Sequence, residues 1–362
     1  MEKKVYLVLE NGQFFEGNAF GAKGEITGEV VFATAMTGYL ETLTDPSYYG
    51  QIVVQTFPLI GNYGVIPADF ESAHSHVKAY IVREWCQEPS NFRSEGNLDT
   101  FLKEQNVIGL CNIDTRQLTR MIREYGVMNA RIVSSVENLD NIVAELKQYR
   151  VTDAVKNTTC QEITTIKPED AKYKVVLMDF GAKKHIHQEL EKRGCEVIVV
   201  PAYTTYEQIM ELKPDGIMLS NGPGDPAENT EVIKELKKLL ETKIPIFGIC
   251  LGHQLVALAT GAKTIKLKYG HRGANQPVKD LVTGNVYITS QNHGYAVDNN
   301  TLSEDCSVRF INANDNTCEG IDYQEIPVFT VQFHPEANGG PRDTMFLFDR
   351  FITLMGGNKE CH

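Results

Sequence analysis

Residues 244–261 read IPIFGICLGHQLVALATG and set the interpretation of the second half of the chain. An apolar, strand-like run ends at Cys250, and a helix-like run starts directly after it. The start of a helix presents unpaired N–H groups and the positive end of the helix dipole, and both stabilise a thiolate. Gly248 and Gly252 suit a sharp turn in which a Cβ atom would clash. The stretch predicts a nucleophilic cysteine on a strand–helix turn, like the serine elbow of hydrolases, or else a buried structural cysteine.

Strand-like and helix-like segments alternate on both sides of this turn. Each strand-like run is continuously apolar, as expected for a sheet that helices cover on both faces. The alternation predicts an α/β domain over residues 173–357 with a mostly parallel, doubly wound sheet, and it places Cys250 at the carboxyl edge of that sheet. Helices are expected over residues 183–194, 205–214, 230–243, 251–261 and 342–356.

The first half of the chain has a different pattern. Residues 1–150 open with alternating strand-like runs that Gly and Asn-Gly interrupt, and helix-like runs follow at 97–106 and 114–126. This order predicts a mixed α+β domain. Residues 151–172 are polar, rich in threonine and without a clear period, so we expect them to form a linker.

Length, charge and cysteine spacing limit the possible functions. The 362 residues suggest two domains, and the net charge of −12 argues against nucleic acid or an anionic membrane as the main partner. Neither a signal peptide nor an apolar run of about 18 residues is found, so a cytoplasmic protein is expected. The eight cysteines are scattered without a CxxC pair, so no metal site is predicted.

A cysteine nucleophile needs a base and a group that orients the base. The sequence VFTVQFHPEANGGP, residues 328–341, places His334 and Glu336 two positions apart after an apolar strand. On one side of the chain, the carboxylate would hold the imidazole tautomer and stabilise its charged form. A polar turn that caps a strand is the other interpretation.

Two further loops are candidates for ligand contact. Residues 220–226, SNGPGDP, follow a predicted strand and form either a plain turn or a source of backbone N–H donors for an oxyanion. Residues 290–297, SQNHGYAV, are either a loop that contacts a ligand or the end of a hairpin.

Together these motifs resemble those of a class I glutamine amidotransferase. NGPGDP, FGICLGHQ, QNHGYAV and QFHPEA occur in the order of that family, over a domain of about residues 173–357. In the first half, GEVVFATAMTGYLETLTDPSYYGQIVVQTFPLIGNYG and CNIDTRQLTRMIREYG resemble the N-terminal domain of the small subunit of carbamoyl phosphate synthetase. The resemblance covers nearly the whole chain.

The resemblance implies a set of site residues. The nucleophile of the family falls on Cys250, its histidine on His334 and its glutamate on Glu336. It also implies contacts with L-glutamine at Ser47, Gly222, Gly224, Leu251, Gln254, Asn292, Gly294 and Tyr295. Ser47 would come from the N-terminal domain, which is expected to dock the partner.

The function implied by the resemblance is hydrolysis of L-glutamine to glutamate and ammonia. The ammonia would pass to a separate large subunit, the second chain of a heterodimer. That subunit uses ATP, Mg²⁺ and bicarbonate to make carbamoyl phosphate for arginine and pyrimidine synthesis. This chain has no GxxxxGK[ST] loop, and it is expected to carry no cofactor of its own.

Two other functions remain open on the sequence. One is a regulatory or scaffolding subunit that keeps the fold without catalysis, against which the presence of Cys250, His334 and Glu336 argues. The other is a stand-alone hydrolase of γ-glutamyl compounds, which leaves the N-terminal domain unexplained.

Overall fold

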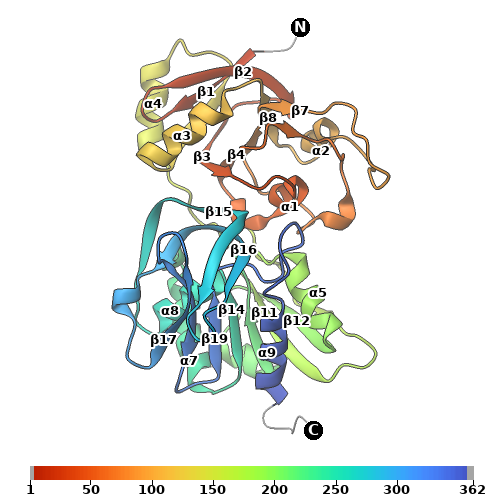
Figure 1. The fold of residues 1–362 in the computed structure, drawn as a ribbon, viewed down its shortest axis with the longest axis vertical. Coiled ribbons are helices and arrows are strands. Elements are labelled where there is room, and N and C mark those ends of the chain that lie inside the picture. The colour runs from red at the N-terminus through yellow and green to blue at the C-terminus, as the bar shows by residue number, and fades with distance from the viewer. Residues whose placement is uncertain (1–3, 357–362) are drawn as a thin grey trace. The chain divides into compact units, whose positions relative to one another are not determined.

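The computed structural model describes residues 4–356, and the chain forms two compact units that meet in sequence at Ala154 and Val155 (Figure 1). The division falls close to the end predicted for the first domain, residue 150. Over the described residues 4–356, the structure holds no helix with the length and apolar character needed to cross a membrane.

The N-terminal unit is built on a closed barrel of seven strands. Their order around the barrel is β1-β2-β8-β6-β4-β3-β9, so that the first and last strands pair. The strands are β1 (Lys4–Leu9), β2 (Phe14–Gly21), β3 (Ile26–Ala33), β4 (Gln51–Gln55), β6 (Ala79–Ile81), β8 (Ile108–Cys111) and β9 (Met128–Val133). A separate ribbon pairs β5 (Leu59–Ile60) with β7 (Glu84–Trp85). The helices are α1 (Tyr39–Thr44), α2 (Leu98–Glu104), α3 (Thr115–Tyr125) and α4 (Leu139–Gln148), with short 3₁₀ turns at Pro46–Tyr48 and Pro67–Asp69.

Alternation along the barrel strands produces two apolar layers. Val30 of β3 and Val54 of β4 pack with Leu118 of α3. Their neighbours in sequence, Val31 and Val53, belong to the layer that contains α1 and α2. Successive side chains of a strand point to opposite faces, so one run of apolar residues serves both layers. Mixed α+β structure is therefore observed, but local pattern did not predict that the sheet closes.

The C-terminal unit contains a ten-stranded sheet in the order β10-β12-β11-β13-β14-β19-β18-β17-β15-β16. Its strands are β10 (Thr164–Ile166), β11 (Tyr173–Asp179), β12 (Cys195–Pro201), β13 (Gly216–Leu219), β14 (Ile246–Ile249), β15 (Thr264–Asp280), β16 (Val286–Val297), β17 (Cys306–Asn312), β18 (Cys318–Tyr323) and β19 (Val328–Val331). The helices are α5 (Lys184–Lys192), α6 (Tyr206–Glu211), α7 (Thr230–Glu241), α8 (Leu251–Ala259) and α9 (Phe346–Gly356), with 3₁₀ turns at Pro226–Glu228 and Asn299–Thr301.

The expectation of a mostly parallel sheet is wrong for the sheet as a whole. Only the five central strands, β12-β11-β13-β14-β19, are joined by parallel pairing. The five other pairings are antiparallel. Four of them join β15–β19, which follow one another without a crossover helix, and the fifth joins β10 to β12.

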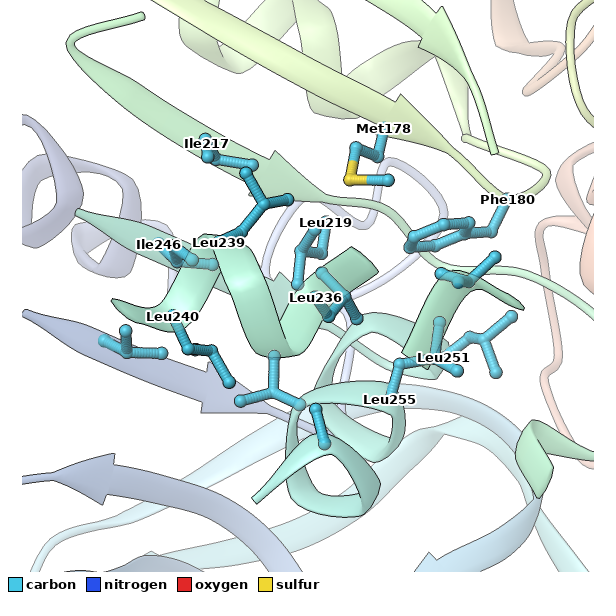
Figure 2. Packing of buried hydrophobic residues seen from close by; sticks show 14 of the residues in the cluster. Met178, Phe180, Ile217, Leu219, Leu236, Leu239, Leu240, Ile246, Leu251 and Leu255 are labelled. Atoms are coloured by element: carbon cyan, nitrogen blue, oxygen red, sulfur yellow. The ribbon is translucent and has the colours of Figure 1, made fainter. Parts of the chain in front are cut away.

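Helices cover both faces of the parallel strands, which is the doubly wound arrangement. Apolar residues of α6, α7 and α8 pack on one face, and those of α5 and α9 pack on the other. Figure 2 shows the first layer, in which Leu236 of α7 lies next to Leu219 of β13 and Leu239 lies next to Ile217. Burial on both faces explains why these strands are continuous apolar runs in the sequence.

The predicted linker, residues 151–172, is in large part a component of the C-terminal unit. Its β10 pairs with β12 at the edge of the sheet. Upstream of β10, Thr159 Oγ1 donates to Asp179 O at 2.5 Å, and Cys160 N donates to Asp179 Oδ2 at 2.7 Å. Hydrogen bonds, and not buried apolar side chains, attach these polar residues to the sheet. Their sequence therefore shows no periodic pattern of apolar residues.

The layer between α7 and β13 provides a test of the packing. Leu236 is fully buried, so we expect Leu236→Ala to lower the free energy of unfolding by about 2–5 kcal/mol through lost transfer energy and a cavity. Lys237→Ala on the exposed side of the same helix should change it by less than about 0.5 kcal/mol. Urea unfolding of the full chain measures both, and equal effects would contradict the assigned face of α7.

Candidate active site

Cys250 occupies a strained turn between β14 and α8. Its φ of 53° and ψ of −103° lie outside the regions that non-glycine residues prefer, at a cost of about 1–3 kcal/mol. Hydrogen bonds hold the turn on both sides: Cys250 N donates to Val331 O at 2.8 Å, and Gln254 N donates to Cys250 O at 3.2 Å.

The glycines beside Cys250 are needed for close packing. A Cβ atom on Gly252 would lie 2.5 Å from Leu219 O, and one on Gly248 would lie 2.9 Å from the Gly252 carbonyl carbon. Gly252 N also donates to Ser220 O at 3.1 Å. The expected steric conflict is therefore present, although the positive φ belongs to the cysteine and not to either glycine.

His334 and Glu336 form a buried pair. His334 Nδ1 lies 2.6 Å from Glu336 Oε1, and His334 N donates to Ser290 O at 2.9 Å, which fixes the backbone beside β16. The two residues meet in a turn after β19 and not on the strand itself. Because β19 pairs in parallel with β14, this turn and the Cys250 turn follow the same ends of neighbouring strands.

The electrostatics of the pair favour a charged imidazole. Burial and the charge of Lys183 act to lower the pKa of His334, but Glu336 and hydrogen bonding to Cys250 and Glu336 outweigh them and raise it. Burial acts to raise the pKa of Glu336, yet the His334 and Lys183 charges and its hydrogen bonds lower it. The other ring nitrogen, His334 Nε2, is buried. Within residues 4–356, no atom forms a hydrogen bond of normal geometry with it.

Lys183 is a buried cation that pattern analysis missed. Its Nζ lies 3.6 Å from Glu336 Oε1, and the residue directly precedes α5. Lys183 N donates to Asn221 Oδ1 at 3.0 Å. Lys183 follows β11, next to the point where the strand order reverses, and ligands of open α/β sheets bind at such points. This location is the signal that could have identified the residue.

The loop of residues 220–226 is tied to the turn and to β11. Ser220 Oγ accepts from Phe180 N at 2.9 Å, and Asn221 Nδ2 donates to Gly181 O at 2.9 Å. Gly222 packs so closely that a Cβ atom there would lie 2.7 Å from Leu251 Cδ2. Gly224 has a φ of 89°, a conformation that favours glycine.

The stretch of residues 290–297 is the last part of strand β16, which forms an antiparallel hairpin with β15, so the hairpin end is observed and the loop is not. Asn292 O lies 3.8 Å from Cys250 Sγ, and Gln254 Nε2 donates to Tyr295 O at 2.8 Å. Gly294 follows Asn292 by two residues on the same strand. These contacts bring predicted glutamine-contact positions of α8 and β16 next to the cysteine.

Ser47 belongs to the N-terminal unit, in the 3₁₀ turn Pro46–Tyr48. Its backbone N–H donates to Asp45 Oδ1 at 2.9 Å, and the residue is buried. A contact of Ser47 with glutamine stays a prediction.

One group of residues has the spacing of a metal site within residues 4–356. Donor atoms of His271, His293 and Glu319 lie within 4.8 Å of one another. His271 already faces a carboxylate at each ring nitrogen, Asp315 Oδ2 at 2.8 Å and Glu319 Oε1 at 3.4 Å. A protonated His271 supplies the positive charge there, so we assign no metal ion to this group.

Comparison with known proteins identifies the family of the chain. Residues 176–354 match the family described as Glutamine amidotransferase class-I, and residues 7–132 match the CPSase domain of the Carbamoyl-phosphate synthase small chain. The chain is 52% identical over 359 residues to a Carbamoyl phosphate synthase small chain of Bacillus cereus, which covers 99% of this chain and 97% of the relative. The C-terminal unit is thus a class I glutamine amidotransferase domain, and the whole chain belongs to the carbamoyl phosphate synthase small chain family.

Other similarities differ in how much of the chain they cover. A small chain of Fusobacterium nucleatum is 52% identical over 356 residues, 98% of this chain and 99% of the relative. A crystal structure of a putative GMP synthase subunit of Thermoplasma acidophilum covers 51% of this chain and 94% of its own, with 23% identity and a TM-score of 0.45.

The charged state of His334 provides a test of the site. In Glu336→Gln the imidazolium loses its carboxylate partner while burial and Lys183 remain, so we expect the pKa of His334 to fall well below its raised value. NMR titration of histidine-labelled chain measures this, and His334→Asn identifies the resonance. A His334 that titrates at the same pH in both chains would contradict the coupling of the pair.

Proposed function

We propose that this chain hydrolyses the side-chain amide of L-glutamine through Cys250, His334 and Glu336, and delivers the ammonia to a large subunit. The observation that carries the proposal is the strained Cys250 turn beside the buried His334–Glu336 pair. The family to which the chain belongs supports the substrate and the partner.

The first half of the reaction forms a thioester. The Cys250 thiolate attacks the amide carbon of glutamine, and the backbone N–H groups of Leu251 and Gly224 stabilise the oxyanion. The C–N bond then breaks, and the leaving nitrogen takes a proton from the His334 imidazolium to depart as ammonia. Glu336 holds the imidazole by its Nδ1 atom and stabilises the charge that it carries before this transfer.

The second half of the reaction releases glutamate. His334, now neutral, removes a proton from a water molecule, and the resulting hydroxide attacks the thioester carbonyl. Collapse of the tetrahedral intermediate breaks the C–S bond and returns the sulfur as a thiolate, with the proton left on His334. The raised pKa of His334 suits this cycle, because the imidazolium must supply the proton that the leaving nitrogen takes.

The fate of ammonia explains why a partner is needed. Free ammonia is protonated at neutral pH and loses its nucleophilicity, so direct transfer to a second site is required. We propose that the large subunit uses it with bicarbonate, ATP and Mg²⁺ to make carbamoyl phosphate for arginine and pyrimidine synthesis. The N-terminal unit, which matches the CPSase domain, is the proposed docking part.

The nucleophile is tested by ammonia release from L-glutamine. We expect Cys250→Ser to lower kcat by at least about 10³-fold, since the alcohol of serine is scarcely ionised where a thiol forms thiolate. Cys195→Ser serves as the matched control, because this buried cysteine lies in β12 away from the turn. Release that persists in Cys250→Ser would contradict the proposed nucleophile.

The coupling is tested by adding a large subunit of the family. The full chain should release more ammonia in its presence, and a chain that begins at Val155 should not respond. Circular dichroism and the reactivity of Cys250 show whether the shortened chain is folded. Equal stimulation of a folded short chain would contradict docking by the N-terminal unit, and Cys250-dependent release that ignores the partner would indicate a stand-alone hydrolase.

A further inference from the structure

A second acid–histidine group lies next to the candidate active site in the antiparallel part of the sheet. His271 of β15 faces two carboxylates, Asp315 at Nε2 and Glu319 of β18 at Nδ1, at 2.8 Å and 3.4 Å. Glu319 is fully buried, and its Oε2 atom has no hydrogen-bond partner within residues 4–356. No step of glutamine hydrolysis uses this group directly.

The geometry gives the protonation of His271. Each of its ring nitrogens faces a carboxylate oxygen, and the amide nitrogen of Asn312 also lies 3.5 Å from Nδ1. The two carboxylates favour a proton on both nitrogens, because a carboxylate only accepts. Burial acts to lower the pKa of His271, but hydrogen bonds to Asp315 and Glu319 outweigh it and raise the pKa to about 9. The imidazolium therefore lowers the cost of the buried charge of Glu319, but burial outweighs it and still raises the pKa of Glu319 above its usual value.

His293 connects this ion pair to the active site. Its ring lies edge-on to His271, with centroids 4.9 Å apart, and its Nε2 is 4.0 Å from Glu319 Oε1. Its Nδ1 lies 2.7 Å from Tyr295 O, and its Nε2 lies 3.1 Å from Gln291 Oε1. Burial and the charge of His271 hold the pKa of His293 well below its usual value, so the ring is neutral, and the shorter contact, to a carbonyl oxygen that can only accept, favours the proton on Nδ1. The same Tyr295 O accepts from Gln254 of α8, the helix that starts at the Cys250 turn.

We propose that His271 and Glu319 are positioning residues for glutamine: their buried ion pair holds the His293 ring, and through it the Asn292–Tyr295 segment against α8. The inference depends on the proposed function, because Asn292, Gly294 and Tyr295 are its expected glutamine contacts. Neither His271 nor Glu319 touches the reacting atoms.

The first test is glutamine hydrolysis by the complex with a large subunit, for the unaltered chain and for Glu319→Gln. This variant keeps the size and one acceptor oxygen of the side chain but removes the charge that His271 balances. We expect KM for glutamine to rise by roughly tenfold while kcat stays within about threefold, since substrate contacts are misplaced and the nucleophile is not. An unchanged KM would overturn the proposal.

A matched control separates positioning from general stability. Asp280→Asn breaks another ion pair of β15, in which the partly exposed Arg309 donates from Nη2 to Oδ2 of the buried Asp280 at 2.8 Å. It should lower Tm without raising KM. A KM that rises equally in Asp280→Asn would overturn the proposal, because any loss of sheet stability would then suffice.

A double variant tests whether the charges act as a pair. Glu319→Gln with His271→Asn removes both charges, so its KM should lie well below the product of the two single effects. Fully multiplicative effects would show that the residues act independently and would overturn the paired role.

Alkylation of Cys250 by iodoacetamide provides a readout that a merely structural role would not move. In Glu319→Gln the rate without glutamine should be unchanged, and protection should need roughly tenfold more glutamine. A changed unprotected rate would show that the nucleophile itself is disturbed and would overturn the assignment. So would a stoichiometric metal ion that is present in the purified chain and lost in Glu319→Gln.

The failure of the proposed function is distinguishable from failure of this inference. If the unaltered complex shows no Cys250-dependent hydrolysis, both are wrong. If it hydrolyses glutamine and Glu319→Gln behaves in the same way, only the positioning role is wrong.

Discussion

The backbone of Cys250 is held at a positive φ, and the other features of the active-site geometry are arranged around that constraint. The strain is maintained by a hydrogen bond to Val331 and by the close approach of Gly252 to Leu219, so three adjacent strands contribute to it. Because β19 is one of these strands, the chain that leaves it delivers His334 and Glu336 to the same edge of the sheet. Strain of this kind persists only where surrounding structure over-determines it, as the fully buried layers on both faces do here.

Buried charge is the second theme of the C-terminal unit. Glu336 is compensated by His334 and Lys183, and Glu319 is compensated by His271. Each group combines one buried carboxylate with a histidine whose pKa is raised, which limits the cost of burial. The first group adjoins the thiol. The second is proposed to support the strand that carries the expected glutamine contacts. A buried carboxylate–histidine pair thus takes part in the proposed reaction in one place and positions the substrate-binding strand in the other.

Prediction from sequence was accurate where the signal was local. The continuous apolar runs of the parallel strands and the amphipathic helices around them are observed close to their expected bounds. It failed where the outcome depended on pairing between distant segments. Barrel closure needs β1 to pair with β9, the antiparallel flank needs β15 to pair with both β16 and β17, and β10 needs an edge strand to join. None of these pairings produces a periodic pattern of apolar residues within a single segment. For this reason the polar stretch before β11 was predicted to be a linker.

The sequence by itself determined the turn at Cys250, its flanking glycines and the adjacency of His334 to Glu336, because each depends on neighbouring residues and on the strand-to-helix change. The tertiary structure alone decided that Lys183 reaches Glu336, that Asn292 approaches the thiol, and that His271 and Glu319 support His293. These contacts join residues far apart in the chain. The order of strands in the sheet brings these residues together, and the local sequence pattern does not predict that order.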